Sequence, residues 1–258
     1  MTSMIDETVL SRIEDAGLNA SAPPQQLWLD GWLVRFSPGK AKRARCINAV
    51  AAGRLPVARK LEQATAVLRD AGLPLVVRLT PFSQPAGLDD TLASLGLQRF
   101  DDTVVMVADL AALDLTGAAP ADLQLQAAEP TAYAAVVGAL RGSPPEQQQA
   151  HAERMRFSPV PYCGWVLRQE GQVLACGQYA REGSMVGVYD VFTAPSARNR
   201  GLSRALCAEL LRRAAAEGAR TAYLQVDVDN QPARAVYRRL GFVDGYHYHY
   251  RAADPARA

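Results

Sequence analysis

The sequence predicts an α/β fold made of two similar units in tandem, and three observations indicate it. Apolar segments of strand length alternate with amphipathic segments of helix length along most of the chain. Residues 188–242 give the clearest case, in which a strand, a glycine turn, a helix and a second strand follow one another. Residues 61–97 repeat the order of helix, glycine, strand and helix found in residues 206–242. A duplicated α/β unit is therefore the expected architecture.

The elements of the first unit can be justified in chain order. Residues 5–16 have a helical apolar pattern, with Ser3 or Asp6 as the expected cap. Asp30-Gly31 is a favoured turn pair and predicts a hairpin. Pro56 suits a first helical turn and Gly72 a helix end. The predicted elements are the hairpin over 27–36, strands at 43–50, 73–79 and 98–110, and helices at 56–69 and 88–95.

The second unit follows a stretch of small residues, 111–121, which is expected to be a linker. The domains are therefore predicted as residues 1–115 and 122–258. Glu170-Gly171 predicts a second hairpin turn. The remaining predicted elements are strands at 123–127, 164–169, 172–181, 185–193, 221–228 and 243–251, and helices at 130–140, 144–157 (a polar helix or lid) and from 202 onward.

The glycine turn at residues 198–203 has the features of an anion-binding site. The first N–H groups of a helix have no internal partner, and the helix dipole favours negative charge there. Gly201 allows a ligand close to the backbone, while Arg198, Arg200 and Arg204 add positive charge. We expect a phosphate or pyrophosphate to bind. The sequence contains neither the P-loop pattern nor the Gly-x-Gly-x-x-Gly pattern.

This turn resembles the signature of the GNAT acyl-CoA-dependent N-acyltransferases, Arg/Gln-x-x-Gly-x-Gly/Ala between a strand and a helix. Arg198, Gly201 and Ser203 occupy its positions, and Ser203 departs from it while remaining small. The similarity covers about residues 121–251 and includes later positions, namely Asn230, Ala233, Tyr237 and Leu240-Gly241-Phe242. The resemblance implies tandem GNAT-like domains. Each would have a mixed, mainly antiparallel, twisted sheet flanked by helices and splayed between two central parallel strands.

The resemblance also implies acetyl-CoA as a co-substrate, without a metal. Backbone groups at the splay would bind pantetheine, and the glycine turn would surround the pyrophosphate. The residues implied are Val191, Phe192 and Thr193 at the splay and Arg198, Asn199, Arg200, Gly201, Leu202, Ser203 and Arg204 at the turn. Asn230 would bond the pantetheine arm, although an asparagine after a strand is often only a helix cap.

Two residues are expected to carry the chemistry. By resemblance, Tyr237 faces the cofactor; its phenol, with a pKa near ~10, would protonate a departing thiolate whose pKa is near ~8.5. A core aromatic is the alternative. Some relatives carry a glutamate where Gln225 or Gly187 stands, which leaves Asp190 as the carboxylate at the splay. We expect Asp190 to orient the amine or deprotonate it through water. A structural pair with an arginine is the alternative, and Asp227 is a weaker substitute.

The first unit is expected to have lost its cofactor site. Gly53-Arg54-Leu55-Pro56 stands before its helix in place of the signature turn, and no tyrosine matches Tyr237. A basic run with Lys40, Lys42, Arg43 and Arg45 is expected to be a solvated face. Tyr246 to Tyr250 contains two histidines without metal-ligand companions, so a surface strand or substrate wall is expected there.

Composition limits the remaining classes. A net charge of +2 demands no nucleic-acid partner, and neither a signal peptide nor a membrane-length apolar run is evident. The four cysteines are scattered, which favours a reduced, cytoplasmic setting. The predicted activity is acetyl transfer to a primary amine of a small molecule or peptide. The alternative is a non-catalytic module for acyl-CoA binding or protein interaction. The oligomeric state is open, with a homodimer among the alternatives.

Overall fold

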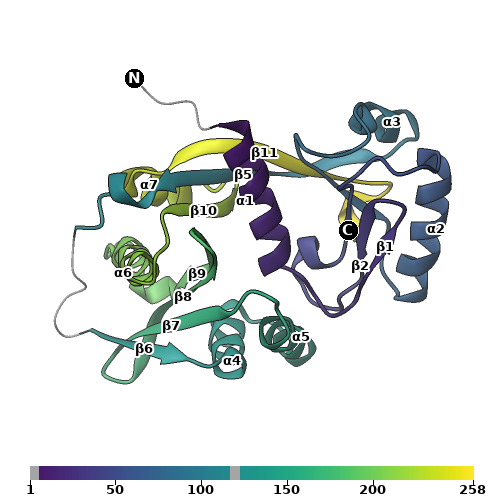
Figure 1. Ribbon diagram of the computed structural model, residues 1–258. Coiled ribbons are helices and arrows are strands. Elements are labelled where there is room, and N and C mark those ends of the chain that lie inside the picture. The colour runs from purple at the N-terminus through teal and green to yellow at the C-terminus, as the bar shows by residue number, and fades with distance from the viewer. Residues whose placement is uncertain (1–5, 117–122) are drawn as a thin grey trace.

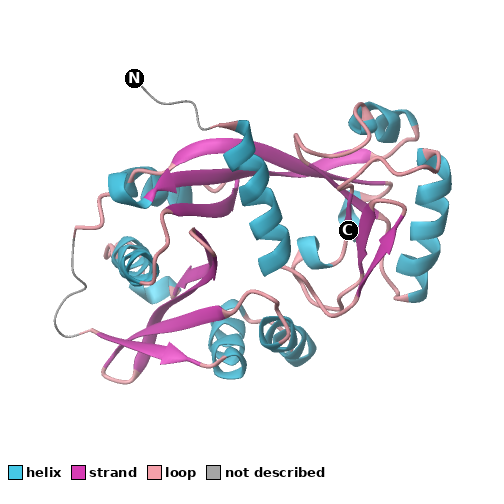
Figure 2. Cartoon of the chain, viewed as in Figure 1, coloured by secondary structure: helices cyan, strands magenta, loops and turns pink. Residues whose placement is uncertain are grey.

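The computed structural model describes residues 6–116 and 123–258, and the strands in these segments form a single sheet (Figure 1, Figure 2). The strands are β1 (Gln26–Leu29), β2 (Trp32–Arg35), β3 (Ile47–Asn48), β4 (Val76–Leu79), β5 (Gln98–Asp109), β6 (Gln124–Ala128), β7 (Tyr162–Gln169), β8 (Gln172–Glu182), β9 (Met185–Thr193), β10 (Thr221–Asp227) and β11 (Val243–Ala252). The helices are α1 (Glu7–Ala20), α2 (Val57–Asp70), α3 (Leu88–Ser94), α4 (Pro130–Arg141), α5 (Pro145–Arg156), α6 (Leu202–Ala216) and α7 (Gln231–Leu240).

The two halves of the chain repeat one order of elements and exchange their last strands. The order β3-α2-β4-α3-β5 is followed by β9-α6-β10-α7-β11. Across the sheet the strands run β1-β2-β3-β4-β11-β5-β10-β9-β8-β7-β6. Only the pairs β3–β4 and β9–β10 are parallel among the described strands. Strand β5 therefore pairs with β10 of the second half, and β11 pairs with β4 of the first. Figure 1 shows these two long strands crossing between the halves.

The largest core lies under α6. Leu206 and Leu210 pack with Met106 of β5 and Leu224 of β10, because the apolar stripe of α6 faces the sheet. Each buried leucine contributes about 1.5–3 kcal/mol. The second half is thus held partly by a strand of the first.

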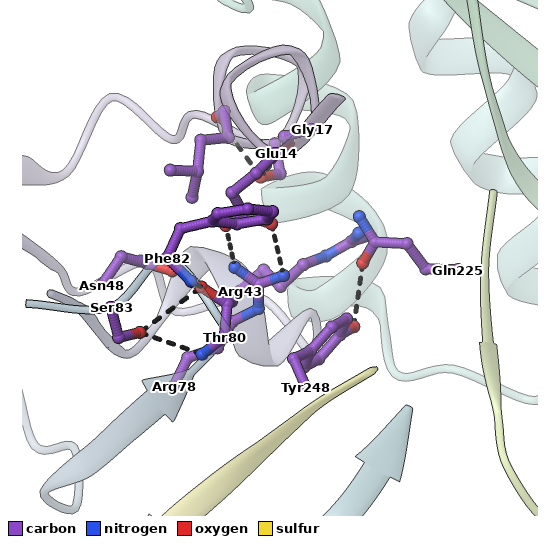
Figure 3. A network of polar contacts seen from close by, with 12 residues as sticks. Glu14, Gly17, Arg43, Asn48, Arg78, Thr80, Phe82, Ser83, Gln225 and Tyr248 are labelled. Atoms are coloured by element: carbon purple, nitrogen blue, oxygen red, sulfur yellow. Dashed lines mark hydrogen bonds and ion pairs between the residues drawn. The ribbon is translucent and has the colours of Figure 1, made fainter. Parts of the chain in front are cut away.

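Helix α1 lies against the middle of the sheet and is tied to it by a buried ion pair. Asp6 caps α1, since its Oδ1 accepts a hydrogen bond from the Thr8 N–H at 3.0 Å. Arg78 of β4 donates to Glu14, with Nη2 to Oε2 at 3.0 Å, and the Tyr246 hydroxyl donates to the same oxygen at 2.6 Å. Figure 3 shows Glu14 and Arg78 within a larger polar network.

Two predictions for the first half and for the C-terminal strand are wrong in part. Only Ile47–Asn48 of the expected strand at 43–50 pairs in the sheet, because residues 42–44 form a 3₁₀ turn. The expected surface strand at Tyr246 to Tyr250 is an interior strand, since β11 lies between β4 and β5. Its three tyrosines are buried, and His249 Nε2 lies 2.9 Å from Asp89 Oδ1.

The basic run is only in part a solvated face, because Lys40 is exposed whereas Lys42, Arg43 and Arg45 are partly buried. Lys42 forms an ion pair with Asp101 at 2.7 Å. Nearby Arg35 is 2% exposed and donates to the Leu18 carbonyl at 2.8 Å and the Ser21 hydroxyl at 3.1 Å. The oxygens at the end of α1 take up its donors, which permits burial of the charge.

Two expectations fall partly outside the described residues: Ser3 as a cap and the 117–121 portion of the linker. Among the helices that the structure describes, none has the length and apolar character needed to cross a bilayer. The other predicted helices and hairpins are confirmed within a few residues.

Candidate active site

The predicted splay is present between β9 and β10. The two strands pair in parallel from Met185/Thr221 to Val188/Leu224, and no pairing follows in the described structure. Strand β9 continues along β8 as far as Thr193. Asp190 adopts a positive φ of 50°, where the β8–β9 register shifts. The edge of β9 facing β10 is therefore left without a strand partner beyond Val188.

A cavity of about 290 Å³, here called the splay cavity, opens at this point. Its walls come mainly from β9, β10, α7 and the β2–β3 connection (residues 36–46), and α4, α5 and β7 contribute one residue each. It brings together four of the predicted site residues, namely Asp190, Val191, Asn230 and Tyr237. Phe192 and Thr193 do not line it; the ring of Phe192 lies 5.6 Å from the Arg141 guanidinium.

A second cavity of about 250 Å³, the α4–α5 cavity, adjoins the first. It lies between α4, α5 and the β2–β3 connection. The two cavities share four lining residues, namely Ala41, Arg141, Arg154 and Asp190. Asp190 therefore stands where the two spaces meet.

Asp190 is held as a carboxylate by its neighbours. Arg141 Nη1 lies 2.9 Å from Oδ1, while Gln178 Nε2 and His151 Nε2 lie 2.8 and 3.1 Å from Oδ2. Burial alone would raise the pKa of Asp190, but the His151 contact and the charges of Arg141 and Arg154 hold that pKa well below its usual value. Such a carboxylate accepts hydrogen bonds well and is a weak base.

Arg141 and His151 are site residues that sequence reasoning missed. The His151 ring packs edge-on against Tyr133, at 6.4 Å between ring centroids, and the Tyr133 hydroxyl donates to the Asp190 carbonyl at 3.1 Å. A histidine whose ring contacts a carboxylate is a common proton acceptor. The one available signal was the spacing of His151 and Arg154, which places both on one face of α5.

Tyr237 keeps its proton. Its ring lies 6.1 Å from that of Phe242, also edge-on, and it lines the splay cavity. Burial raises the pKa of Tyr237 well above its ordinary value, so the phenol is neutral at physiological pH. It can donate a hydrogen bond or a proton into the cavity.

Asn230 has the capping role that was its alternative. Its Oδ1 accepts a hydrogen bond from the Ala233 N–H at 3.2 Å and caps α7. The side chain also lines the splay cavity, and its amide N–H₂ takes no part in the cap.

The glycine turn before α6 is open to a ligand. Gly201 has φ 73° and precedes the first helical residue, and no side chain caps α6. A Cβ on Gly201 would meet no atom within 4 Å. Arg204 pairs with Asp114 at 2.6 Å and Arg200 bonds Gln169 at 3.1 Å, while Arg198 is exposed. The first N–H groups of α6 thus fit a phosphate.

The corresponding loop of the first half already holds an internal anion. The Asp30 carboxylate accepts hydrogen bonds from the N–H groups of Arg54 and Leu55, both within 2.9 Å. Lys60, which is fully buried, lies 3.2 Å from the same carboxylate. Pro56, at the helix cap, has no N–H to offer. An aspartate therefore occupies the place that a phosphate would need.

Comparison with known proteins decides the family of this site. Residues 132–242 match the model of the acetyltransferase (GNAT) family. These residues belong to the GNAT family. The match contains α4, α5, the splay and the glycine turn, and the family uses acetyl-CoA. Among the described residues no group of three or more His, Cys, Asp and Glu side chains is arranged to hold a metal ion.

Two relatives in sequence are mycothiol acetyltransferases. A mycothiol acetyltransferase of Actinosynnema mirum is 30% identical over 184 residues, covering 67% of this chain and 61% of that protein. A mycothiol acetyltransferase of Streptomyces scabiei is 52% identical over 56 residues, covering 22% and 18%. The chain thus spans less than two thirds of the length of either relative.

Solved structures share the fold over most of the chain. A GCN5-related N-acetyltransferase from Kribbella flavida matches with a TM-score of 0.64 at 19% identity, covering 96% of this chain and 95% of that one. A tandem GNAT protein from the clavulanic acid biosynthesis pathway matches with a TM-score of 0.63 at 17% identity, covering 77% and 70%. The expected tandem GNAT fold is confirmed.

Proposed function

We propose that residues 122–258 form an acetyl-CoA-dependent N-acetyltransferase domain and that residues 1–115 form a degenerate GNAT-like domain. The observation that carries the proposal is that an ionised Asp190 and a protonated Tyr237 line one cavity at the splay. The similarity to mycothiol acetyltransferases supports acetyl transfer. Asp30 in the loop of the first half supports a single cofactor site.

The cofactor would bind along the open edge of β9 and the start of α6. Backbone groups of Val191, Phe192 and Thr193 would hold pantetheine, with Asn230 donating from the opposite wall. The pyrophosphate would lie on the glycine turn, over the N–H groups of Arg198, Asn199, Arg200, Gly201, Leu202, Ser203 and Arg204.

Acetyl transfer would proceed by direct attack. The amine nitrogen forms a bond to the thioester carbonyl carbon, and the carbon–sulfur bond then breaks. The departing thiolate takes the phenolic proton of Tyr237, which solvent restores. Asp190 accepts a hydrogen bond from the amine and orients the His151 ring, which takes the proton that the amine loses. The products are an N-acetylated amine and free CoA thiol.

The test combines calorimetry with a thiol-release assay. Acetyl-CoA titrated into the full chain should bind at one site, and a panel of primary amines should then release free thiol. Binding without thiol release for every amine would favour the alternative, a non-catalytic module. An absence of binding would remove the acetyltransferase proposal altogether.

A further inference from the structure

Two arginines on the walls of these cavities, one buried and one partly buried, form no ion pair with a carboxylate among the described residues. Arg154 is 8% exposed and lines both cavities. Arg43 lines the splay cavity, and its Nη1 is buried without a hydrogen-bond partner in the described structure. Within the described part of the chain, the guanidinium groups of Arg154 and Arg43 are both beyond salt-bridge distance of every carboxylate. A buried cation without a partner is costly, so the pair is suited to an anion that arrives with a ligand.

The charges around the two cavities are unbalanced toward positive. The cationic side chains are Lys40, Arg43, Arg141 and Arg154, and the carboxylates are Asp190 and Asp227. Asp190 is already matched by Arg141 at 2.9 Å. Asp227 is then the one carboxylate left for the three remaining cations, Arg43, Arg154 and Lys40, so the walls keep an excess of two positive charges.

The two arginines come from different halves of the protein. Arg154 is on α5, and Arg43 is on the β2–β3 connection, where its guanidinium lies 5.7 Å from the centre of the Tyr189 ring. Figure 3 shows Arg43 beside residues of α1, β4 and β10. The first half thus contributes a charged wall to the cavity of the second.

We propose that the acceptor is a small amine that also carries an oxyanion, bound by Arg154 and Arg43 while Asp190 receives the amine. This rests on the proposed function and names its substrate class. The planar fork of a guanidinium donates two parallel hydrogen bonds to a carboxylate or a phosphate. An amine without an oxyanion has no pair of oxygens to accept them. An acceptor of this class supplies both the anion that the arginines lack and the N–H group that Asp190 accepts.

The test compares matched acceptors with and without the anion. Glycine and leucine are compared with glycinamide and leucinamide, and phosphoethanolamine with ethanolamine, by kcat/KM for thiol release. The amides have the more acidic ammonium groups, so ease of proton loss favours the amides and cannot produce a preference for the anion. We expect the better of the two anionic classes to exceed its neutral partner by roughly 10- to 100-fold. Equal or inverted ratios would overturn the proposal.

Variants then assign the preference to the arginines. In Arg154→Gln and Arg43→Gln the ratio should fall by at least roughly 10-fold, while the acetyl-CoA Kd stays unchanged. Arg154→Lys should recover part of it, since the charge remains without the fork. Arg156→Gln is the matched control, because Arg156 is exposed on the same helix away from both cavities. A wild-type ratio in both glutamine variants would contradict the assignment.

A binding measurement separates this proposal from the proposed function. If no amine releases thiol, N-acetylglycine and N-acetylglycinamide are titrated into the CoA-saturated protein. Preferential binding of the carboxylate, lost in Arg154→Gln, would support the anion site while the transferase proposal fails. Equal binding of both compounds would overturn the anion site as well.

Discussion

Asp190 and Tyr237 face one cavity, and their surroundings fix their protons in opposite ways. The cations and hydrogen-bond donors around Asp190 favour its charged form. The apolar packing around Tyr237 favours its neutral form. At the residue scale, the site can therefore present an acceptor and a donor together over the whole physiological pH range.

Replacing Tyr237 by phenylalanine should reduce kcat by roughly 10²- to 10⁴-fold, because the proton for the departing thiolate is lost. The acetyl-CoA Kd from calorimetry should change little, since the ring remains in place. Tyr179→Phe is the control; that hydroxyl bonds Glu217 at 2.7 Å and lies outside both cavities. Equal rates in Tyr237→Phe and the wild type would remove Tyr237 as the acid.

Asp190→Asn should reduce turnover at every pH from 6 to 9, because the variant loses the carboxylate that accepts the amine hydrogen bond and holds the His151 ring. The pKa of Asp190 lies well below its usual value, so the wild-type carboxylate is ionised throughout this range and contributes no titration there. A pH–rate series for both proteins measures this. Wild-type turnover in Asp190→Asn across the series would remove Asp190 from the mechanism.

Sequence reasoning found those parts of the site that lie close together in the chain. Asp190, the glycine turn and Tyr237 fall within one βαβ unit, so their order predicts their proximity. Arg141 and His151 were not predicted as site residues, because the α4–α5 segment contains no motif that indicates contact with Asp190. Arg43 escaped because its charge predicted a solvated position, and only the fold brings the β2–β3 connection to the cavity.

At the scale of elements, the start of α6 and the start of α2 show how one loop can be open or closed. In each half, this loop lies directly before the first helix of the repeated unit. Gly201 leaves the first turn of α6 free, whereas Asp30 reaches from the β1–β2 turn and satisfies the loop before α2. The distinction depends on a side chain more than 20 residues away from that loop, which motif spacing could not reveal.

Gly201→Glu should abolish acetyl-CoA binding in calorimetry, because a carboxylate would stand where the phosphate is expected. The positive φ of 73° adds a conformational cost of about 1–2 kcal/mol. Gly87→Glu is a matched control, since Gly87 has the same φ, precedes α3 and also has open space beside it. If both variants bind acetyl-CoA as the wild type does, the turn is not the phosphate site.

Glu14→Gln should destabilise the protein at pH 7 and destabilise it less at pH 2.5. Burial alone would raise the pKa of Glu14, but the charge and hydrogen bonds of Arg78 and Tyr246 lower it. A lowered pKa contributes stability above the unfolded value of about 4.3 and loses it as pH falls through the folded value. Urea unfolding at the two pH values measures the difference; an equal difference at both would contradict it.

At the scale of the whole molecule, the exchanged strands make each half depend on the other. The predicted division at residues 115 and 122 separates the halves in sequence, yet β5 completes the sheet beside β10, and β11 completes it beside β4. The repeat was predictable from its period and its glycines. The exchange of β5 and β11 was not predictable. Each of these apolar strands would lie between two other strands with or without the exchange.

Residues 122–258 expressed alone should not give a folded monomer. Removing β5 exposes the edge of β10 and the apolar side chains of Leu206, Leu210 and Leu224, which pack with Met106 in the full chain. Co-expression with residues 1–115 should restore solubility and acetyl-CoA binding. Size-exclusion chromatography and calorimetry report both. A soluble, monomeric fragment that binds acetyl-CoA would show that the exchange is dispensable.

The same exchange also determines when β5 can pair with its neighbours during synthesis of the chain. Strand β5 ends at Asp109, and its two neighbours, β10 and β11, are the last strands to leave the ribosome. About 140 residues separate the end of β5 from the end of β11, and at roughly 5–20 residues per second their synthesis takes about 7–30 s. During that interval an apolar strand waits with both edges unpaired. The order of the strands in the sheet therefore creates a need for chaperones during translation.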